Sequence, residues 1–336
     1  MDFLRRVGVF GVLWDSDRVL VVRDGVGGEF PGIWRLPGDA VAHAEHPERA
    51  MVRAVAEQTG LTVVVGRLRT VVADVVTYPE GDVALHTDRL LFELAAQHGA
   101  LRDGVQPHGV PGDAVLREGA PGDGVLPGDA SGDGVMGDVG GGAVDRVCWL
   151  TLAEAARVPL TPFTAGVLGL PVTPLAPGTP QARVPFSPPH PDRRLRFGAY
   201  GLVTDPAGRI LLTEIAAGYP GAGLWHLPGG GTDHGEQPAT GLLRELVEEG
   251  GQRGRVEEIL GVNNLHNPAA LGPEGRPLDW HGVRVTYRVL VDTPSDAVVT
   301  ESAGGSTARA GWFTREQALD LPLSDIAALA IGQSGR

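Results

Sequence analysis

Four charged residues stand close together near the middle of the second half of the chain: Arg244, Glu245, Glu248 and Glu249. On a helix, this spacing places Glu245 beside both Glu248 and Glu249 on one face. Like charges at such positions repel, so on spacing alone a solvated acidic surface helix is the simpler interpretation. A divalent cation that prefers oxygen ligands would make the same cluster a metal site.

The residues before this helix favour the second interpretation. Residues 227–231 read Leu-Pro-Gly-Gly-Gly, and Glu236 follows, eight positions before Arg244. A glycine-rich loop allows the backbone to approach a ligand closely. The loop and the acidic helix together therefore indicate a bound ligand rather than a solvated surface.

At this point the segment resembles the Nudix box, which reads Gly, five residues, Glu, seven residues, Arg-Glu, an aliphatic residue, any residue, Glu-Glu, any residue, Gly and an aliphatic residue. The final aliphatic position departs from the pattern, since Gln252 stands there. The resemblance extends over about residues 196–331. The matching residues are Gly230, Glu236, Arg244, Glu245, Leu246, Glu248, Glu249 and Gly251.

The resemblance implies a hydrolase of phosphate anhydrides that depends on Mg²⁺, with Mn²⁺ as an alternative. The implied metal ligands are the carboxylates of Glu245, Glu248 and Glu249 and the carbonyl of Gly229; Glu245 or Glu248 would also orient or deprotonate the attacking water. Such ligands fit the chemistry, because a pyrophosphate resists attack until divalent cations neutralise its charge. The implied supporting residues are Gly230, Glu236, Arg244 and Gly251, and a base from a later loop would be Glu274 or Glu301.

The chain also contains an internal repeat. Trp34-Arg35-Leu36-Pro37-Gly38 recurs 191 residues later as Trp225-His226-Leu227-Pro228-Gly229, and further pairs follow at the same offset. Near the end of each copy the offset falls to 163, so the first copy holds about 28 extra residues. The repeat predicts a first domain at 1–170 with a disordered Gly/Pro/Asp-rich insertion at 97–144, a proline-rich linker at 171–194 and a second domain at 195–332.

The first copy differs from the second at the positions that carry chemistry. Ala54 stands where the second copy has Glu245, Gln58 stands where it has Glu249, and the box glycine, Gly38, comes one position early. The one remaining helix carboxylate, Glu57, would hold Mg²⁺ poorly against water. We therefore expect a catalytically silent first domain, which either packs on the second domain or binds a nucleotide and regulates it.

The elements around the second box predict an α+β fold. Apolar runs at 197–204 and 209–214 flank the tight-turn sequence Asp205-Pro206-Ala207-Gly208. A helix is predicted from Pro238 to about Gly250, because proline is favoured in a first turn and Gly251 suits a left-handed cap. Further strands are expected at 256–262, 283–291 and 308–313, and helices at 315–319 and 324–331. With the resemblance, these elements imply two tandem Nudix-type α/β/α sandwich domains with mixed sheets.

Composition narrows the classes of partner. A net charge of -13 argues against nonspecific binding to nucleic acid or to an anionic membrane. The single cysteine, Cys148, excludes an intrachain disulfide and a thiolate zinc cluster. The apolar run near the N-terminus is too short for a membrane span or a signal core. We expect a soluble cytoplasmic protein, and the oligomeric state stays open.

The substrate predicted by these features is a nucleoside diphosphate linked to another moiety. Trp280 could stack on a base, and Pro268 stands 16 residues past Gln252, about where a proline marks ADP-ribose-cleaving members of the family. Two alternatives remain. One is a nucleotide-binding sensor without hydrolysis, and the other is the isomerase branch of the superfamily, which uses a cysteine that Cys148 is poorly placed to supply.

Overall fold

A computed structural model describes residues 2–78, 82–99, 101, 143–176, 192–271, 277–300 and 305–333. Most of the predicted insertion at 97–144 and of the predicted linker at 171–194 lies outside these residues. Glu274 and Glu301, considered above as a base from a later loop, also lie outside them. None of the described helices is long and apolar enough to cross a membrane.

The second half of the chain forms the elements that its sequence predicts, together with two short strands at 225–226 and 229–231 that it does not predict. The helix α4 ends at Gly250, and Gly251 takes the left-handed conformation that caps it, with a φ of 67°. Two strands extend beyond their predicted ends, because the pairing between them continues through polar residues after the apolar alternation stops. The elements are β8 (Arg193–Thr204), β9 (Ile210–Ile215), β10 (Trp225–His226), β11 (Gly229–Gly231), α4 (Pro238–Gly250), β12 (Arg255–Leu271), β13 (Pro277–Leu290), β14 (Thr307–Phe313), α5 (Arg315–Leu319) and α6 (Asp325–Gln333).

The first half repeats the same order of elements. Its central helix has a proline in the first turn and a left-handed glycine cap at Gly60, as the second helix has at Gly251. The elements are β1 (Asp2–Asp15), β2 (Arg18–Asp24), β3 (Trp34–Arg35), β4 (Gly38–Ala40), α1 (Pro47–Thr59), β5 (Thr62–Tyr78), β6 (Val83–His98), β7 (Val144–Thr151), α2 (Leu152–Ala155) and α3 (Pro162–Val167).

Among the described residues, each half carries one mixed seven-stranded sheet. The strand order is β3-β2-β1-β6-β5 in the first and β10-β9-β8-β13-β12 in the second, with two further strands attached to each. One central pair is parallel in each sheet, β1 with β6 and β8 with β13, and the other pairs are antiparallel. The α+β prediction of two domains with mixed sheets is therefore confirmed, and the equal strand orders agree with a duplication.

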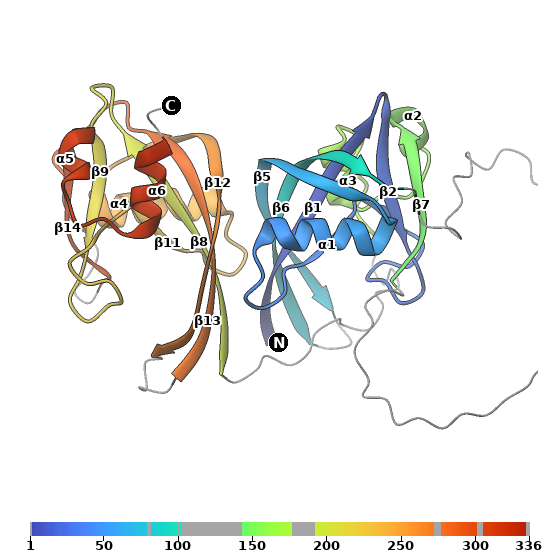
Figure 1. Ribbon diagram of the computed structural model, residues 1–336, viewed down its shortest axis with the longest axis horizontal. Helices are drawn as coiled ribbons and strands as arrows, with labels where there is room; N and C mark the ends of the chain where they lie inside the picture. The colour runs from blue at the N-terminus through green and yellow to red at the C-terminus, as the bar shows by residue number, and fades with distance from the viewer. Residues whose placement is uncertain are drawn as a thin grey trace, which may run out of the picture.

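The central strands of each sheet are apolar on both faces, which is why helices cover both. In β8, Phe197 and Ala199 belong to the hydrophobic cluster under α4, while Leu202 belongs to the cluster under α5 and α6. Alternate residues of a strand point to opposite faces, so one apolar strand supplies both layers. The result is a three-layered domain with the sheet in the middle, and Figure 1 shows the two domains side by side.

The two domains make reciprocal contacts. The loop before α4 reaches β6 of the first domain, where the backbone N–H of Gly235 donates to His86 Nδ1 at 2.7 Å. The loop before α1 reaches β13 of the second domain, where His43 Nε2 lies 2.9 Å from Asp279 Oδ2. One hydrophobic cluster also includes residues of both domains. Each domain therefore uses the same loop to contact the same strand of the other domain.

Candidate functional site

The glycine loop of the second domain is held against the sheet by strand pairing. Within β11, Gly229 pairs with Tyr200 and Gly230 with Ala199 of β8. Gly229 has a φ of 130°, and a Cβ atom there would lie 2.2 Å from the carbonyl oxygen of Ala199. A residue other than glycine cannot take this position without moving the strand. The requirement explains a glycine at the start of the loop and places residues 229–231 beside α4.

The acidic helix packs against this loop through two of its carboxylates. Glu249 is only 4% exposed; its carboxylate accepts hydrogen bonds from the backbone N–H of Gly229 at 2.9 Å and from the hydroxyl of Thr307 at 2.6 Å. Glu245 lies under Gly230, where a Cβ atom would stand 2.9 Å from Glu245 Oε1. The second glycine therefore leaves room for a carboxylate between helix and loop.

Arg244 joins the loop to the helix. Its guanidinium donates to both carboxylate oxygens of Glu236 at 3.1 Å, to Glu245 at 3.0 Å and to Glu248 at 3.3 Å. The hydrogen bonds from Arg244 hold the pKa of Glu236 below its ordinary value although burial acts in the opposite direction.

The structure therefore brings the sequence-predicted carboxylates together at one loop. Three carboxylates, those of Glu236, Glu245 and Glu248, contact the guanidinium of Arg244, and a fourth, Glu249, lies almost fully buried against the loop. A half-buried group of hard oxygen donors with excess negative charge fits a hydrated Mg²⁺. The residues that could hold the ion are Gly229, through its carbonyl, and Glu245, Glu248 and Glu249.

A group of cationic and aromatic side chains lies on the sheet next to the glycine loop, and the sequence reasoning did not find it. A Cβ atom on Gly231 would lie 2.6 Å from Arg196 Nε, and one on Gly198 would lie 3.3 Å from the hydroxyl of Tyr200. The pKa of Tyr200 is raised by burial, and it feels the charges of Arg196, Arg284, Glu245 and Glu249. These cations and carboxylates are thus close enough to act on one hydroxyl.

Arg284 is a member of this group with an unsatisfied donor among the described residues. Its Nη2 donates to Asn263 Oδ1 at 2.7 Å, while its Nε is buried without a hydrogen-bond partner in the described part of the chain. Burial lowers the pKa of the guanidinium, because a charged group loses solvation there. The repeat itself carried a signal for this residue. When β13 is aligned with β6, Arg284 falls at the position of Arg89, so an arginine recurs there in both copies.

Trp280 and Pro268, the predicted substrate contacts, lie on the hairpin of β12 and β13. On β8, Trp280 pairs with Arg194, whereas Gly230 of the glycine loop pairs with Ala199. The two positions are five residues apart along this strand. At the usual rise of a strand this is roughly 16 Å along the sheet from the glycine loop. The structure therefore does not gather these two residues with the carboxylates.

The first domain has the same loop with different side chains. Gly38 pairs with Phe10 as Gly229 pairs with Tyr200, so Gly38 corresponds to Gly229. The strand register thus agrees with the sequence comparison: Gly38 stands one position before the place of the box glycine Gly230, and Asp39 takes that place. The carboxylate of Asp39 accepts from Arg53 Nη1 at 3.1 Å, and Ala54 is fully buried.

The pair that corresponds to Glu249 and Gly229 is also changed. Gln58 Oε1 accepts from the backbone N–H of Gly38 at 3.1 Å, as Glu249 accepts from Gly229. The amide nitrogen of Gln58 then donates to the carbonyl of Gly38 at 2.8 Å. The carbonyl of Gly38 corresponds to the carbonyl of Gly229, the candidate metal ligand. In the first domain this carbonyl therefore accepts a hydrogen bond from the side chain of Gln58.

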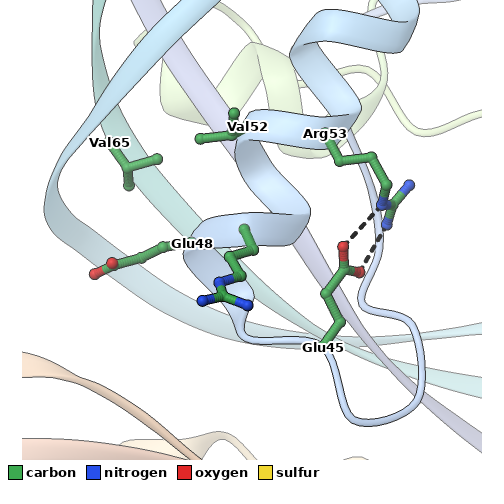
Figure 2. Close-up of a pocket in the computed structure, with 6 residues that line it drawn as sticks. Glu45, Glu48, Val52, Arg53 and Val65 are labelled. Atoms are coloured by element: carbon green, nitrogen blue, oxygen red, sulfur yellow. Dashed lines mark hydrogen bonds and ion pairs between the residues drawn. The ribbon is translucent and has the colours of Figure 1, made fainter.

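An open hollow of about 590 Å³ lies beside α1 in the first domain, and Arg53 with Glu45 forms part of its lining. Figure 2 shows this pair joined by two hydrogen bonds, both 2.9 Å long, with Val52 and Val65 on the other side. The supporting ion pair of the box is therefore kept in the copy that has lost two helix carboxylates.

Comparisons with known proteins agree with this description. A profile of the NUDIX domain matches residues 4–112 and 193–330. The chain is 32% identical over 79 residues to Nudix hydrolase 6 of Arabidopsis thaliana and 42% identical over 62 residues to a MutT-like protein of Streptomyces ambofaciens. These alignments cover 24% and 18% of the chain, and only 28% and 38% of the two relatives.

Solved structures with a similar fold include a MutT NUDIX hydrolase from Burkholderia pseudomallei, with 30% identity, a TM-score of 0.33, and coverage of 42% of this chain and 98% of that one. Another is the NUDIX domain of Shewanella oneidensis NrtR in complex with ADP ribose, with 20% identity, a TM-score of 0.34, and coverage of 42% and 87%. The NUDIX profile matches a segment in each half of the chain, and together these segments hold more than half of the residues of the chain. The chain therefore belongs to the NUDIX family.

Proposed function

We propose that the second domain hydrolyses a phosphate anhydride in a nucleoside diphosphate derivative, with Mg²⁺ bound at Gly229, Glu245, Glu248 and Glu249. The observation that carries this proposal is the group of three helix carboxylates at one glycine loop, two of which contact Arg244. The family of the chain makes hydrolysis of such a bond the first expectation.

Each residue of the site has a distinct task in this proposal. Bound Mg²⁺ would neutralise the diphosphate and bring water close to phosphorus. Glu249 is held in place by Gly229 and Thr307, so it presents a fixed oxygen to the ion. Glu245 or Glu248 orients the attacking water and accepts its proton. Arg244 keeps the helix against the loop through Glu236.

Arg284 and Arg196 supply positive charge on the sheet beside the carboxylates. A diphosphate that bridges both groups would offer an acceptor to the unpartnered Nε of Arg284. In the reaction, the oxygen of water forms a bond to one phosphorus, and the bridging oxygen leaves with the electron pair of the broken P–O bond. Two phosphate products result, and the leaving oxygen takes up a proton.

The first domain, in this proposal, does no chemistry and supports the second. Ala54 is buried, Asp39 fills the position of Gly230, and Gln58 donates to the Gly38 carbonyl. These features leave no carboxylate at the positions of Glu245 and Glu249, while Asp39 and Glu57 are paired with Arg53. The reciprocal contacts between the domains give the first domain a structural role, with regulation by a bound nucleotide as the alternative.

The decisive experiment measures phosphate or nucleotide release by the full chain, with and without Mg²⁺. The panel contains nucleoside triphosphates, dinucleoside polyphosphates and nucleotide sugars. We expect one class to be cleaved only with metal, and Glu245→Gln and Glu248→Gln to reduce turnover by at least about 10³-fold, since lost charge stabilisation is worth several kcal/mol.

The first domain provides the matched control, because Glu57 corresponds to Glu248 and contacts Arg53 as Glu248 contacts Arg244. Glu57→Gln should leave turnover unchanged. An active Glu248→Gln variant would remove the role assigned to this residue. If no compound is cleaved but one binds tightly, the protein is a nucleotide sensor instead.

A further inference from the structure

Two histidines and one aspartate meet where the first domain touches the second. Nε2 of His266 lies 2.8 Å from Oδ1 of Asp279, and Nε2 of His43 lies 2.9 Å from Oδ2 of the same carboxylate. The three ligand atoms lie within 4.8 Å of one another. His43 belongs to the loop before α1, whereas His266 and Asp279 lie on β12 and β13.

The donor set differs from that of the carboxylate site. Two imidazoles and one carboxylate suit Zn²⁺ and related transition metals, whereas Mg²⁺ prefers oxygen ligands alone. Zn–N and Zn–O bonds of about 2.0 Å put the ligands of a tetrahedral ion about 3.3 Å apart, so small side-chain rotations suffice here. The side chains are 20%, 34% and 27% exposed, which leaves an entry path and a position for water.

Hydrogen bonding alone does not account for the orientation of His43. Its Nε2 is buried and makes no hydrogen bond of acceptable geometry with the described residues, although Asp279 Oδ2 is only 2.9 Å away. A neutral imidazole whose lone pair points at a shared ion would have this arrangement. Arg193 Nε, at 3.5 Å from Asp279 Oδ2, is a weak competitor for the carboxylate.

The reciprocal contact on the other side of the interface lacks these donors. His234 corresponds to His43 in the repeat, but it faces the backbone carbonyl of Ala84 at 3.3 Å. The strand registers align Ala84 with Asp279 and Val75 with His266. The same three positions therefore occur twice in this chain, once as His43, His266 and Asp279 and once as His234, Val75 and Ala84; at the second place, the nearby His86 is paired with Asp88.

We propose that His43, His266 and Asp279 bind one Zn²⁺-like transition-metal ion that fastens the first domain to the β12–β13 hairpin of the second. The ion would join two segments more than 200 positions apart in the sequence. It would act beside the two hydrogen bonds exchanged between Gln237 and Ala73 and the one from Arg5 to Thr232, which connect the domains elsewhere. The proposal is independent of the hydrolytic activity.

The test uses the full chain, freed of metal by chelation and then dialysed against Zn²⁺ as the only transition metal. Excess Mg²⁺ is present to occupy the carboxylate site. We expect one tightly bound Zn²⁺ per chain, and the same stoichiometry in the Glu248→Gln variant, whose carboxylate site is impaired. His43→Ala and the isosteric Asp279→Asn should each weaken Zn²⁺ binding by about 100-fold or more. His234→Ala, at the corresponding position, should bind Zn²⁺ as the unaltered protein does.

A second readout follows the interface itself. Hydrogen exchange at residues 41–46 and 264–266 should slow when Zn²⁺ is added to the unaltered protein and to His234→Ala, but not to Asp279→Asn. Replacement by Co²⁺ should give the visible absorption of a site with nitrogen ligands in the unaltered chain and in His234→Ala, but not in Asp279→Asn. Absence of Zn²⁺ binding, or equal binding by folded Asp279→Asn, would overturn the proposal.

Discussion

The side-chain amide of Gln58 donates to the carbonyl of Gly38 at 2.8 Å, whereas Glu249 at the corresponding position in the second domain accepts from the backbone N–H of Gly229. An ionised carboxylate cannot donate a hydrogen bond, so the carbonyl of Gly229 accepts none from the side chain of Glu249. One amide in place of one carboxylate therefore removes two candidate metal ligands of the first domain at once.

The first prediction follows from this exchange. Glu249→Gln should give the second domain the hydrogen bonds of the first, with the new amide donating to Gly229. We expect turnover with Mg²⁺ to fall by about 100-fold or more, because a carboxylate ligand and a carbonyl ligand are both affected. Steady-state kinetics over a range of Mg²⁺ concentrations measures the change, and Gln58→Glu is the control that should leave activity as it is.

The second prediction runs in the opposite direction. Restoring Glu at positions 54 and 58 is not sufficient by itself, because Glu245 occupies space that Gly230 leaves open and Asp39 fills that position in the first domain. Asp39→Gly with Ala54→Glu and Gln58→Glu, made in the Glu248→Gln chain, should recover Mg²⁺-dependent hydrolysis. The Glu248→Gln chain alone is the baseline. A folded triple variant with no gain over it would mean that the first domain lacks more than ligands.

Sequence reasoning predicted much of this architecture because the signals were local. The helix from Pro238 to Gly250 carried its own start and stop, and the loop and the carboxylates stood in one short segment. The α+β class followed from apolar runs of strand length and from the repeat. The roles of the carboxylates stay predictions, since no comparison tests them residue by residue.

What the sequence reasoning missed depends on contacts between distant segments. Arg284 has significance only because β13 lies beside β8, which brings it near Tyr200 and the glycine loop. His43 stands in a loop of the first domain, and nothing near it in the sequence indicates Asp279 as its neighbour. The place of Asp39 at the position of Gly230 follows from the 191-residue offset of the repeat, and the strand register agrees with it.

A third prediction compares the corresponding arginines of the two domains. Arg89 is paired with Asp74 at 3.1 Å and lies over Phe10 and Phe163, so Arg89→Gln should lower the free energy of unfolding by roughly 2–3 kcal/mol. Arg284 forms no ion pair with the residues that the structure describes, so Arg284→Gln should change this free energy by less than about 1 kcal/mol. Its effect should instead be a KM raised roughly 10- to 100-fold, the value of a charge-assisted hydrogen bond to substrate.

Urea unfolding and steady-state kinetics of both variants test this contrast. Arg284→Lys, which keeps the charge, should recover part of the lost affinity but not all, because lysine lacks the planar donors. A large loss of stability in Arg284→Gln with unchanged KM would contradict the assignment of Arg284 to substrate binding.

The last prediction concerns His226, whose Nδ1 lies 2.5 Å from Ser324 Oγ. Burial, with the nearby charge of Arg284, lowers the pKa of His226 from 6.5 to about 4. Between these values the unfolded chain binds the proton and the folded chain does not, so stability is complete above pH 6.5 and declines as the pH falls toward 4. From pH 7.5 to pH 5.0 the loss from this residue is on the order of 1–2 kcal/mol. Urea unfolding at these two pH values should show a smaller loss in His226→Gln than in the unaltered chain, and equal losses would contradict the shifted pKa.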